Sequence, residues 1–264
     1  MHNITGKRVL ITGGAGGLGK ALAQKLSAMG ARVAIADADP AALKATSREL
    51  GIKGYSMDVT NPDSILKVRR TLLTEFGGLD ILINNAGVVF GGSFADSALE
   101  HHTKTYQVNA LGPVNVTHAF FESICAGPEG HIVFVASASG YIGLPFGSSY
   151  ASSKWAVIGF AESIRLELKE QKRNNVHITT VCPSYIDTGM FTGASAPFLT
   201  PILHTEDVAE KIVQAILRKR TYVNLPWIVN WIQTLRGVLP LFVFDFLMRS
   251  LKVSQSMMHW KGRT

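Results

Sequence analysis

The stretch "RVLITGGAGGLGKALAQKLSAMG", Arg8 to Gly30, combines an apolar run, a glycine-rich turn and an amphipathic segment. The apolar run, Arg8 to Thr12, has the length and composition of a buried β-strand. After the turn, apolar side chains recur at helical spacing and share one face. They are Leu18, Leu22, Leu26 and Met29. The stretch therefore predicts a strand, a sharp turn and a helix in direct succession.

The turn itself, "TGGAGGLG" from Thr12 to Gly19, has the composition of a phosphate-binding loop. A side chain here would keep the backbone away from a pyrophosphate, whereas the first N–H groups of the helix attract that anion. A tight turn without a ligand would also accept these glycines, but the position after a first strand favours dinucleotide binding. The expected contacts come from Thr12, Gly13, Gly17, Leu18 and Gly19.

Asp37 ends the second predicted strand and bears on the choice of dinucleotide. A carboxylate at this place accepts hydrogen bonds from the adenosine ribose hydroxyls and repels a 2′-phosphate. Neither Gly16 nor Ala38 carries a positive charge that would neutralise such a phosphate. The sequence thus favours NAD over NADP, and a solvated turn aspartate is the alternative for Asp37 taken alone.

Strand and helix patterns alternate along the chain, which predicts parallel strands joined by right-handed crossovers. We expect an α/β fold: a single Rossmann-type doubly wound parallel sheet of about seven strands with helices on both faces. Residues 1–225 would form the catalytic domain, extended by amphipathic helices in residues 226–264. The predicted strands are 8–12, 32–37, 53–59, 80–87, 130–137, 177–183 and 221–226. The predicted helices include 40–50, 61–76, 98–125, 149–172 and one that Thr205 would cap.

Composition excludes several classes of protein. The net charge of +7 belongs to residues 218–264, which hold 8 basic side chains and one acid, Asp245, so a uniformly basic nucleic-acid-binding surface is not expected. Cys125 and Cys182 form neither a disulfide framework nor a zinc motif. We therefore expect a reducing, cytoplasmic setting and no metal. The first residues resemble neither a signal peptide nor a membrane span.

Tyr150 and Lys154 lie in "GSSYASSK" and share one face if this segment is helical. A phenol titrates near ~10, too high for a base at neutral pH. A nearby ammonium and an oxidised nicotinamide favour the phenolate, and a lowering by about three units corresponds to roughly 4 kcal/mol. Tyr141 lacks such a partner and is expected to line a pocket.

Taken together, these motifs resemble the short-chain dehydrogenase/reductase family in order and spacing, over about residues 6–225. Ser184 departs from the family pattern, which usually has glycine after the proline, and would alter the loop near the nicotinamide. The matching motifs are "TGGAGGLG", Asp58-Val59, "NNAG" (84–87), Asn109, Ser137, "YASSK" (150–154), Pro183 and Thr188.

The resemblance implies four catalytic side chains. Tyr150 would exchange a proton with the alcohol or carbonyl oxygen. Lys154 would lower the pKa of Tyr150 and bond the nicotinamide ribose. Ser137 would hold the substrate oxygen as charge develops on it. Asn109 would anchor a water chain that leads protons to Lys154.

It also implies cofactor contacts and an assembly. Asp58 and Val59 would contact the adenine, Asn85, Ala86 and Gly87 would pass beside the ribose, and Thr188, a few residues after Pro183, would bond the carboxamide. Relatives pair through the helices that carry Asn109 and Tyr150, so we expect a homodimer or homotetramer.

Two apolar segments indicate a hydrophobic substrate. Residues 189–204 match the family's mobile lid, although an ordinary packed connection is the alternative. Residues 226–264 predict two amphipathic helices too interrupted to span a bilayer. They suit either a peripheral membrane contact or packing against the domain or a second subunit. The expected apolar underside of the lid is Met190, Phe191, Phe198, Leu199 and Ile202.

Two functions remain at this point. The first is an NAD-dependent oxidoreductase that interconverts an alcohol with its ketone or aldehyde on a retinoid, steroid or long-chain substrate, because the tail and "PSYIDTGMF" are similar to the retinol and hydroxysteroid dehydrogenase branch. The second is a dinucleotide-sensing or lipid-surface binding protein without turnover. A sensor has no need of Asn109, Ser137, Tyr150 and Lys154 together, which favours the enzyme.

Overall fold

The computed structural model of the protein describes residues 3–262. Within them, seven strands form one parallel sheet in the order β3-β2-β1-β4-β5-β6-β7. The predicted α/β class is therefore confirmed. The strands are β1 (Arg8–Thr12), β2 (Arg32–Asp37), β3 (Lys53–Ser56), β4 (Ile81–Asn84), β5 (Gly130–Val135), β6 (Val176–Pro183) and β7 (Tyr222–Leu225).

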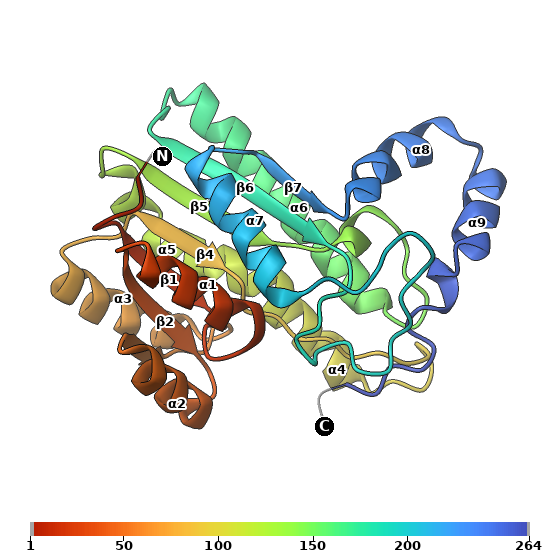
Figure 1. Ribbon diagram of the computed structural model, residues 1–264, viewed down its shortest axis with the longest axis horizontal. Helices are drawn as coiled ribbons and strands as arrows, with labels where there is room; N and C mark the ends of the chain where they lie inside the picture. Colours follow the sequence, from red (N-terminus) through yellow and green to blue (C-terminus); the bar gives the residue numbers. More distant parts are fainter. Residues whose placement is uncertain (1–2, 263–264) are drawn as a thin grey trace.

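Both faces of the sheet are covered by helices, which explains why the strands read as continuous apolar runs. In β1, Leu10 packs into one core cluster while Val9 and Ile11 pack into the other. One face carries α3 (Pro62–Phe76), α5 (Gly112–Cys125) and α6 (Ser148–Glu170). The opposite face carries α1 (Gly17–Ala28), α2 (Pro40–Leu50) and α7 (Thr205–Leu217) (Figure 1).

The segment predicted as one helix, 98–125, is interrupted in the middle. It consists of α4 (Leu99–Tyr106), a π-helical turn (Gln107–Leu111) and α5. Pro113 has no N–H to give to the carbonyl of Asn109, and its ring would crowd that carbonyl, so the regular helix cannot continue. The widened turn contains Asn109, and π-turns of this kind are frequent at functional sites.

Four strands end earlier than the sequence predicts, among them β5 at Val135 and β7 at Leu225. β3 stops at Ser56 and β4 at Asn84, because the residues that follow leave the sheet and line a cleft at its carboxyl edge. The predicted cap of α7 is also wrong. Thr205 is the first residue of that helix, and its N–H and hydroxyl both donate to Asp187 Oδ1, at 2.8 and 2.6 Å.

Beyond β7, the chain forms a 3₁₀ turn (Trp227–Trp231) and two helices, α8 (Ile232–Val238) and α9 (Leu241–Ser250). Val229 and Phe244 are buried in the same core cluster as α6, so this extension packs on the domain. The two helices project at one end of the molecule, and the chain then returns toward α4 (Figure 1). Over residues 3–262, no helix combines the length and apolar character needed to cross a bilayer.

Candidate active site

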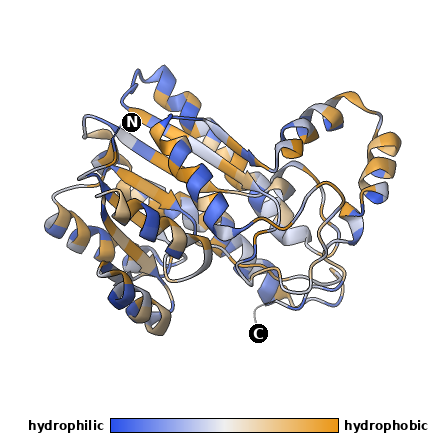
Figure 2. Ribbon diagram, viewed as in Figure 1, coloured by the Kyte–Doolittle hydropathy of each residue, from blue (hydrophilic) through white to orange (hydrophobic). Residues whose placement is uncertain are grey.

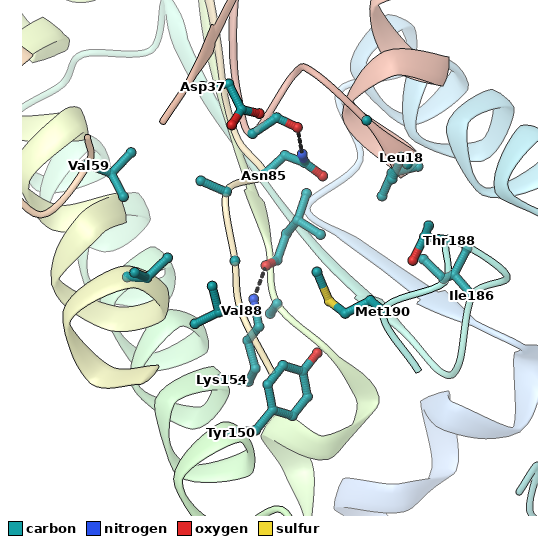
Figure 3. Close-up of a pocket in the computed structure, with 18 of the residues that line it drawn as sticks. Leu18, Asp37, Val59, Asn85, Val88, Tyr150, Lys154, Ile186, Thr188 and Met190 are labelled. Carbon is teal, nitrogen blue, oxygen red and sulfur yellow. Dashed lines mark hydrogen bonds between the residues drawn. The ribbon is translucent and has the colours of Figure 1, made fainter. Parts of the chain in front are cut away.

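A cleft of about 310 Å³ opens at the carboxyl edge of the sheet, where strand order reverses between β1 and β4. Ligands of open α/β sheets bind at such a switch point. Loops from six strands bring most of the predicted cofactor residues to this one cleft (Figure 3). The predicted residues that line it are Gly13, Gly17, Leu18, Asp37, Asp58, Val59, Asn85, Ala86, Gly87, Tyr150, Lys154, Pro183 and Thr188.

The glycine turn has the shape of a cradle for a pyrophosphate. Gly13 and Gly17 adopt φ angles of 62° and 51°, in the left-handed region that favours glycine. A Cβ at Gly19 would collide with the carbonyl oxygen of Gly13, so the helix packs directly on the turn. Gly16 precedes α1 with open space around it. The residues present therefore fit a dinucleotide whose phosphates meet the N-terminus of α1.

Thr12 and Asn85 fix this turn to the neighbouring strand. Thr12 Oγ1 accepts from the backbone N–H groups of Asn85 and Ala86, at 3.1 and 3.0 Å. Asn85 Nδ2 donates to the carbonyls of Thr12 and Gly13, at 3.0 and 2.9 Å. Thr12 and Gly19 do not line the cleft themselves, in contrast to the sequence prediction. Their place is behind the turn, where they determine its shape.

Asp37 lies at the far end of the cleft from Tyr150 (Figure 3). Its Oδ2 accepts from the N–H of Ala15 at 3.0 Å and its Oδ1 from that of Asp39 at 3.1 Å. These bonds hold the carboxylate in place, and each oxygen keeps a lone pair for a further donor. Asp37 is therefore ready to accept hydrogen bonds from ribose hydroxyls.

Lys104 of α4 also lines the cleft, beside Asp58, and the sequence did not indicate it. Burial disfavours the Asp58 carboxylate, but hydrogen bonds from the N–H and hydroxyl of Thr60 and the nearby Lys104 ammonium hold its pKa below the usual range. Only the tertiary fold brings α4 to this edge. Other lining residues that the motifs missed include Met57, Val88, Val108 and Ile186.

Tyr150 and Lys154 are neighbours on α6 and both are buried, with exposed fractions of 6% and 5%. The Lys154 ammonium lies 5.7 Å from the centre of the Tyr150 ring. Its Nζ donates to the carbonyl oxygen of Val135 at 2.9 Å, as the dashed line in Figure 3 shows. The Tyr150 hydroxyl points into the cleft (Figure 3).

Burial dominates the titration of this pair. It raises the pKa of the Tyr150 phenol above its ordinary value, although a hydrogen bond with Ser137 works in the opposite direction. Burial also lowers the pKa of Lys154 to about 8. The ammonium alone therefore does not lower the phenol pKa, and the lowering that the sequence predicts for the ammonium together with an oxidised nicotinamide stays a prediction. A further positive charge at the site is needed to favour the phenolate.

Ser137 lies with Tyr150 in a second, smaller cavity of about 70 Å³ that adjoins the cleft. Its hydroxyl accepts from the N–H of Ser139 at 3.2 Å and donates to the carbonyl of Pro183 at 3.4 Å. The long second bond leaves the hydroxyl free to turn toward another acceptor. Ser137 therefore faces the place where a substrate oxygen would meet Tyr150.

Asn109 lies behind the cleft and does not line it. Its Oδ1 accepts from the N–H of Val88 at 2.8 Å, and its Nδ2 donates to the Val88 carbonyl at 2.9 Å and to Ser153 Oγ at 3.2 Å. These bonds commit the side chain to holding the loop after β4 beside α6. The water chain expected at Asn109 remains a prediction.

Tyr141 lines neither the cleft nor the small cavity beside Ser137, so the pocket-lining role expected for it is not found at either place. Its ring is buried in the core, its hydroxyl donates to Asn224 Oδ1 at 3.1 Å, and it accepts from the thiol of Cys182 at 3.2 Å. The side chain turns toward β6 and β7 because these partners lie there. Across residues 3–262, no group of three or more His, Cys, Asp or Glu side chains is placed to hold a metal ion.

The prediction that five apolar side chains form the underside of the lid is correct for two of them and wrong for three. Met190 and Phe191 face the cleft, as expected. Phe198, Leu199 and Ile202 are exposed on the outside instead. The space beneath them is taken by the end of the chain, since the N–H of Phe198 bonds the carbonyl of Leu251 at 3.0 Å.

The glycine cradle gives a direct test. Replacing Gly19 with Ala places a methyl group against the Gly13 carbonyl and should weaken NADH binding by about tenfold or more, equivalent to about 1.4 kcal/mol. Fluorescence titration with NADH measures this change. The matched control is Gly159→Ala in α6, which has open space around it, lies outside the cleft and should bind normally. Equal affinities for the two variants would contradict the cradle.

Comparisons with known proteins agree with this geometry. A family model described as short chain dehydrogenase matches residues 7–197. Epidermal retinol dehydrogenase 2 of Mus musculus is 36% identical over 247 residues, which cover 90% of this chain and 80% of the relative. Estradiol 17-beta-dehydrogenase 11 of Homo sapiens is 31% identical over 256 residues, covering 95% and 85%.

Solved structures agree as well. A short chain dehydrogenase/reductase from Burkholderia phymatum in complex with NAD is 26% identical, with a TM-score of 0.82, and 90% of this chain matches 95% of that one. An alcohol dehydrogenase from Thermococcus sibiricus complexed with 5-hydroxy-NADP is 25% identical, with a TM-score of 0.71 and coverage of 83% and 94%. The sheet order, the cleft and these matches together place the chain in the short-chain dehydrogenase/reductase family of oxidoreductases.

Proposed function

We propose that the protein interconverts an alcohol and its ketone or aldehyde on a hydrophobic substrate, with Tyr150 as the general acid and base. The observation that carries this proposal is the position of Tyr150, which lines both the cofactor cleft and the small apolar cavity. A proton donor at that junction reaches the oxygen of a molecule whose carbon faces the cofactor. A protein that only sensed dinucleotide would not need a buried phenol and Ser137 at this junction.

Each side chain has a distinct part in this mechanism. The glycine turn, Asp37 and Lys154 would hold a nicotinamide dinucleotide, which would supply hydride chemistry at the carbinol carbon. Tyr150 takes the alcohol proton during oxidation and returns it during reduction. Ser137 donates a hydrogen bond to the substrate oxygen where negative charge develops. Lys154, buried beside the phenol, stabilises its ionised form through charge.

The acid–base role predicts a large loss of turnover in Tyr150→Phe. General acid–base groups contribute roughly 10²–10⁴-fold, so kcat should fall at least about 100-fold while NADH binding stays within about twofold. Steady-state rates on a panel of fatty, retinoid and sterol alcohols measure the first, and fluorescence titration the second. Tyr141→Phe, which removes a hydroxyl outside both cavities, should keep most of the activity. Unchanged kcat in Tyr150→Phe would favour the non-catalytic alternative.

We further propose a preference for NAD over NADP. The Asp37 carboxylate is held at the ribose end of the cleft by two backbone N–H groups, where a 2′-phosphate would meet a negative charge. Lys104 lies in the same cleft, but it neighbours Asp58, which already offsets its charge.

For this preference, Asp37→Ala should raise the ratio of kcat/KM for NADP over NAD by about tenfold, equivalent to about 1.4 kcal/mol. Asp39→Ala is the control. Asp39 caps α2 through the N–H groups of Ala41 and Ala42, so its loss should cost stability, about 1 kcal/mol, without changing the ratio. An unchanged ratio in Asp37→Ala would remove the basis for the preference.

We also propose that the protein works in the cytoplasm at a membrane surface. Large apolar side chains stand exposed along α8, α9 and the outside of the lid, and α9 is coloured largely hydrophobic in Figure 2. Trp at an interface and nearby Arg249 and Lys252 suit contact with anionic lipid headgroups. The extension thus combines both alternatives, packing inward and presenting an apolar face outward. The exposed side chains are Trp227, Trp231, Val238, Leu241, Phe242, Phe246, Phe198, Leu199 and Ile202.

A second surface suits another copy of the chain. Tyr106 and Leu111 are exposed on and just after α4, and Leu166 is exposed on α6, which packs beside α4. Apolar side chains grouped on adjoining helices favour association. We propose that this face forms the dimer expected from the family resemblance.

The membrane contact is tested with the double variant Phe242→Ser and Phe246→Ser. Both side chains are exposed, at 76% and 69%, so the fold should tolerate the change. Co-sedimentation with anionic phosphatidylserine vesicles should fall about tenfold or more, because two apolar side chains no longer enter the interface. Leu66→Ser, an exposed apolar position on α3, is the control. If the wild type, the double variant and Leu66→Ser sediment equally, the membrane contact is contradicted and only the packing role of the extension remains.

A further inference from the structure

The end of the chain returns to the active site. After α9, residues 251–262, here called the returning segment, run back toward α4 (Figure 1). Their backbone bonds antiparallel to the lid, residues 189–204. Three hydrogen bonds join them, at 3.0, 2.8 and 2.9 Å: Phe198 N to Leu251 O, Ser195 N to Ser256 O, and Lys261 N to Thr192 O. Lid and returning segment therefore form one cover.

Two glycines allow the returning segment to pass closely, Gly91 on the domain and Gly193 within the lid. A Cβ at Gly91 would lie 2.8 Å from the Trp260 ring, and one at Gly193 would collide with the carbonyl oxygen of His259. The Trp260 indole also donates to the carbonyl of Met190 at 3.1 Å. The close contacts fix where the returning segment passes, and hence which of its side chains point inward.

Met257 is the side chain that this path delivers to the buried cluster that includes Tyr150. It is 1% exposed and belongs to the small buried cluster of Val89, Leu144, Tyr150 and Ala151. The preceding residue is fixed as well, because Tyr185 Oη donates to Ser256 Oγ at 2.7 Å. The following residue, Met258, is 51% exposed.

The room left for substrate is small. The cavity beside Ser137 and Tyr150 measures about 70 Å³, and Val253 and Ser256 of the returning segment form part of its wall. Pockets for drug-sized ligands measure roughly 300–1,000 Å³. A broad ring system therefore reaches Tyr150 only if the cover yields, whereas a slim chain needs less displacement.

We propose that Met257 is a specificity-determining residue: its bulk in the buried cluster of Tyr150, next to the cavity wall formed by Ser256, limits the width of the substrate at the reacting carbon. The inference rests on the proposed alcohol–carbonyl function, because width matters at the carbon that meets Tyr150. An unbranched, flexible thioether fills this space without a fixed shape, so its volume sets the limit. Larger or smaller side chains at this position should move the limit in opposite directions.

The test compares a slim and a wide substrate of equal polarity. The slim pair is a linear secondary octanol and its ketone, and the wide pair is a bicyclic decalol and its ketone. We expect Met257→Ala to raise kcat/KM for decalol relative to octanol by about tenfold, as one or two methylenes in an apolar pocket do. Met257→Phe should lower the same ratio. Met258→Ala, at the exposed neighbour, should leave it within about twofold.

Ketone affinity, measured by the shift in Tm on ketone binding in the presence of NADH, gives a second readout that needs no turnover. The affinity for the wide ketone relative to the slim ketone should rise in Met257→Ala and fall in Met257→Phe. The inference is overturned if Met257→Ala and Met257→Phe shift the decalol-to-octanol ratio of kcat/KM, and the matching ratio of ketone affinities, in the same direction. It is also overturned if both variants behave like Met258→Ala. If the wild type oxidises neither alcohol, the proposed function fails, and the ketone affinities still decide the role of Met257.

Discussion

The phenol of Tyr150 and the ammonium of Lys154 are held together where water scarcely reaches, and burial drives each toward its neutral form. In such surroundings charges interact more strongly than in water, so a positive charge brought to the cleft changes the phenol far more than it would at the surface. Under the proposed mechanism, proton transfer by Tyr150 is therefore coupled to cofactor binding, because the positive charge of the oxidised dinucleotide favours the phenolate.

The rest of the fold maintains this buried pair. Asn109 fixes the loop after β4 with three hydrogen bonds, and Val135 at the end of β5 accepts from Lys154. The C-terminal extension acts from the other side. Arg236 of α8 stacks 4.2 Å above the ring of Trp155 and donates to the carbonyl of Tyr141 at 3.1 Å. The extension thus contacts the residue next to Lys154 as well as covering Tyr150.

Much of the fold and of the cleft lining was predictable from local sequence patterns. Periodicity and glycine placement predicted the sheet. The motifs predicted about half of the residues that line the cleft, because many of these follow a strand end and Tyr150 and Lys154 share one face of a helix. Lys104 and Met257 were not predictable, since only tertiary packing brings α4 and the returning segment to the site. The outward turn of Phe198 and the buried hydroxyl of Tyr141 were missed for the same reason: their partners, Leu251 and Asn224, are distant in sequence. The lowered phenol pKa was expected from the Lys154 ammonium together with an oxidised nicotinamide, and it stays a prediction, because burial raises that pKa in the protein alone.

The coupling between cofactor and phenol can be measured by ultraviolet difference titration of wild type against Tyr150→Phe, which isolates one tyrosine among 6. Without dinucleotide, Tyr150 should not ionise below about pH 10, the ordinary range of a phenol. With saturating NAD, a single phenol should titrate at a pH several units lower. An identical titration in both states would contradict the account, because Tyr150 would then gain nothing from the cofactor's charge.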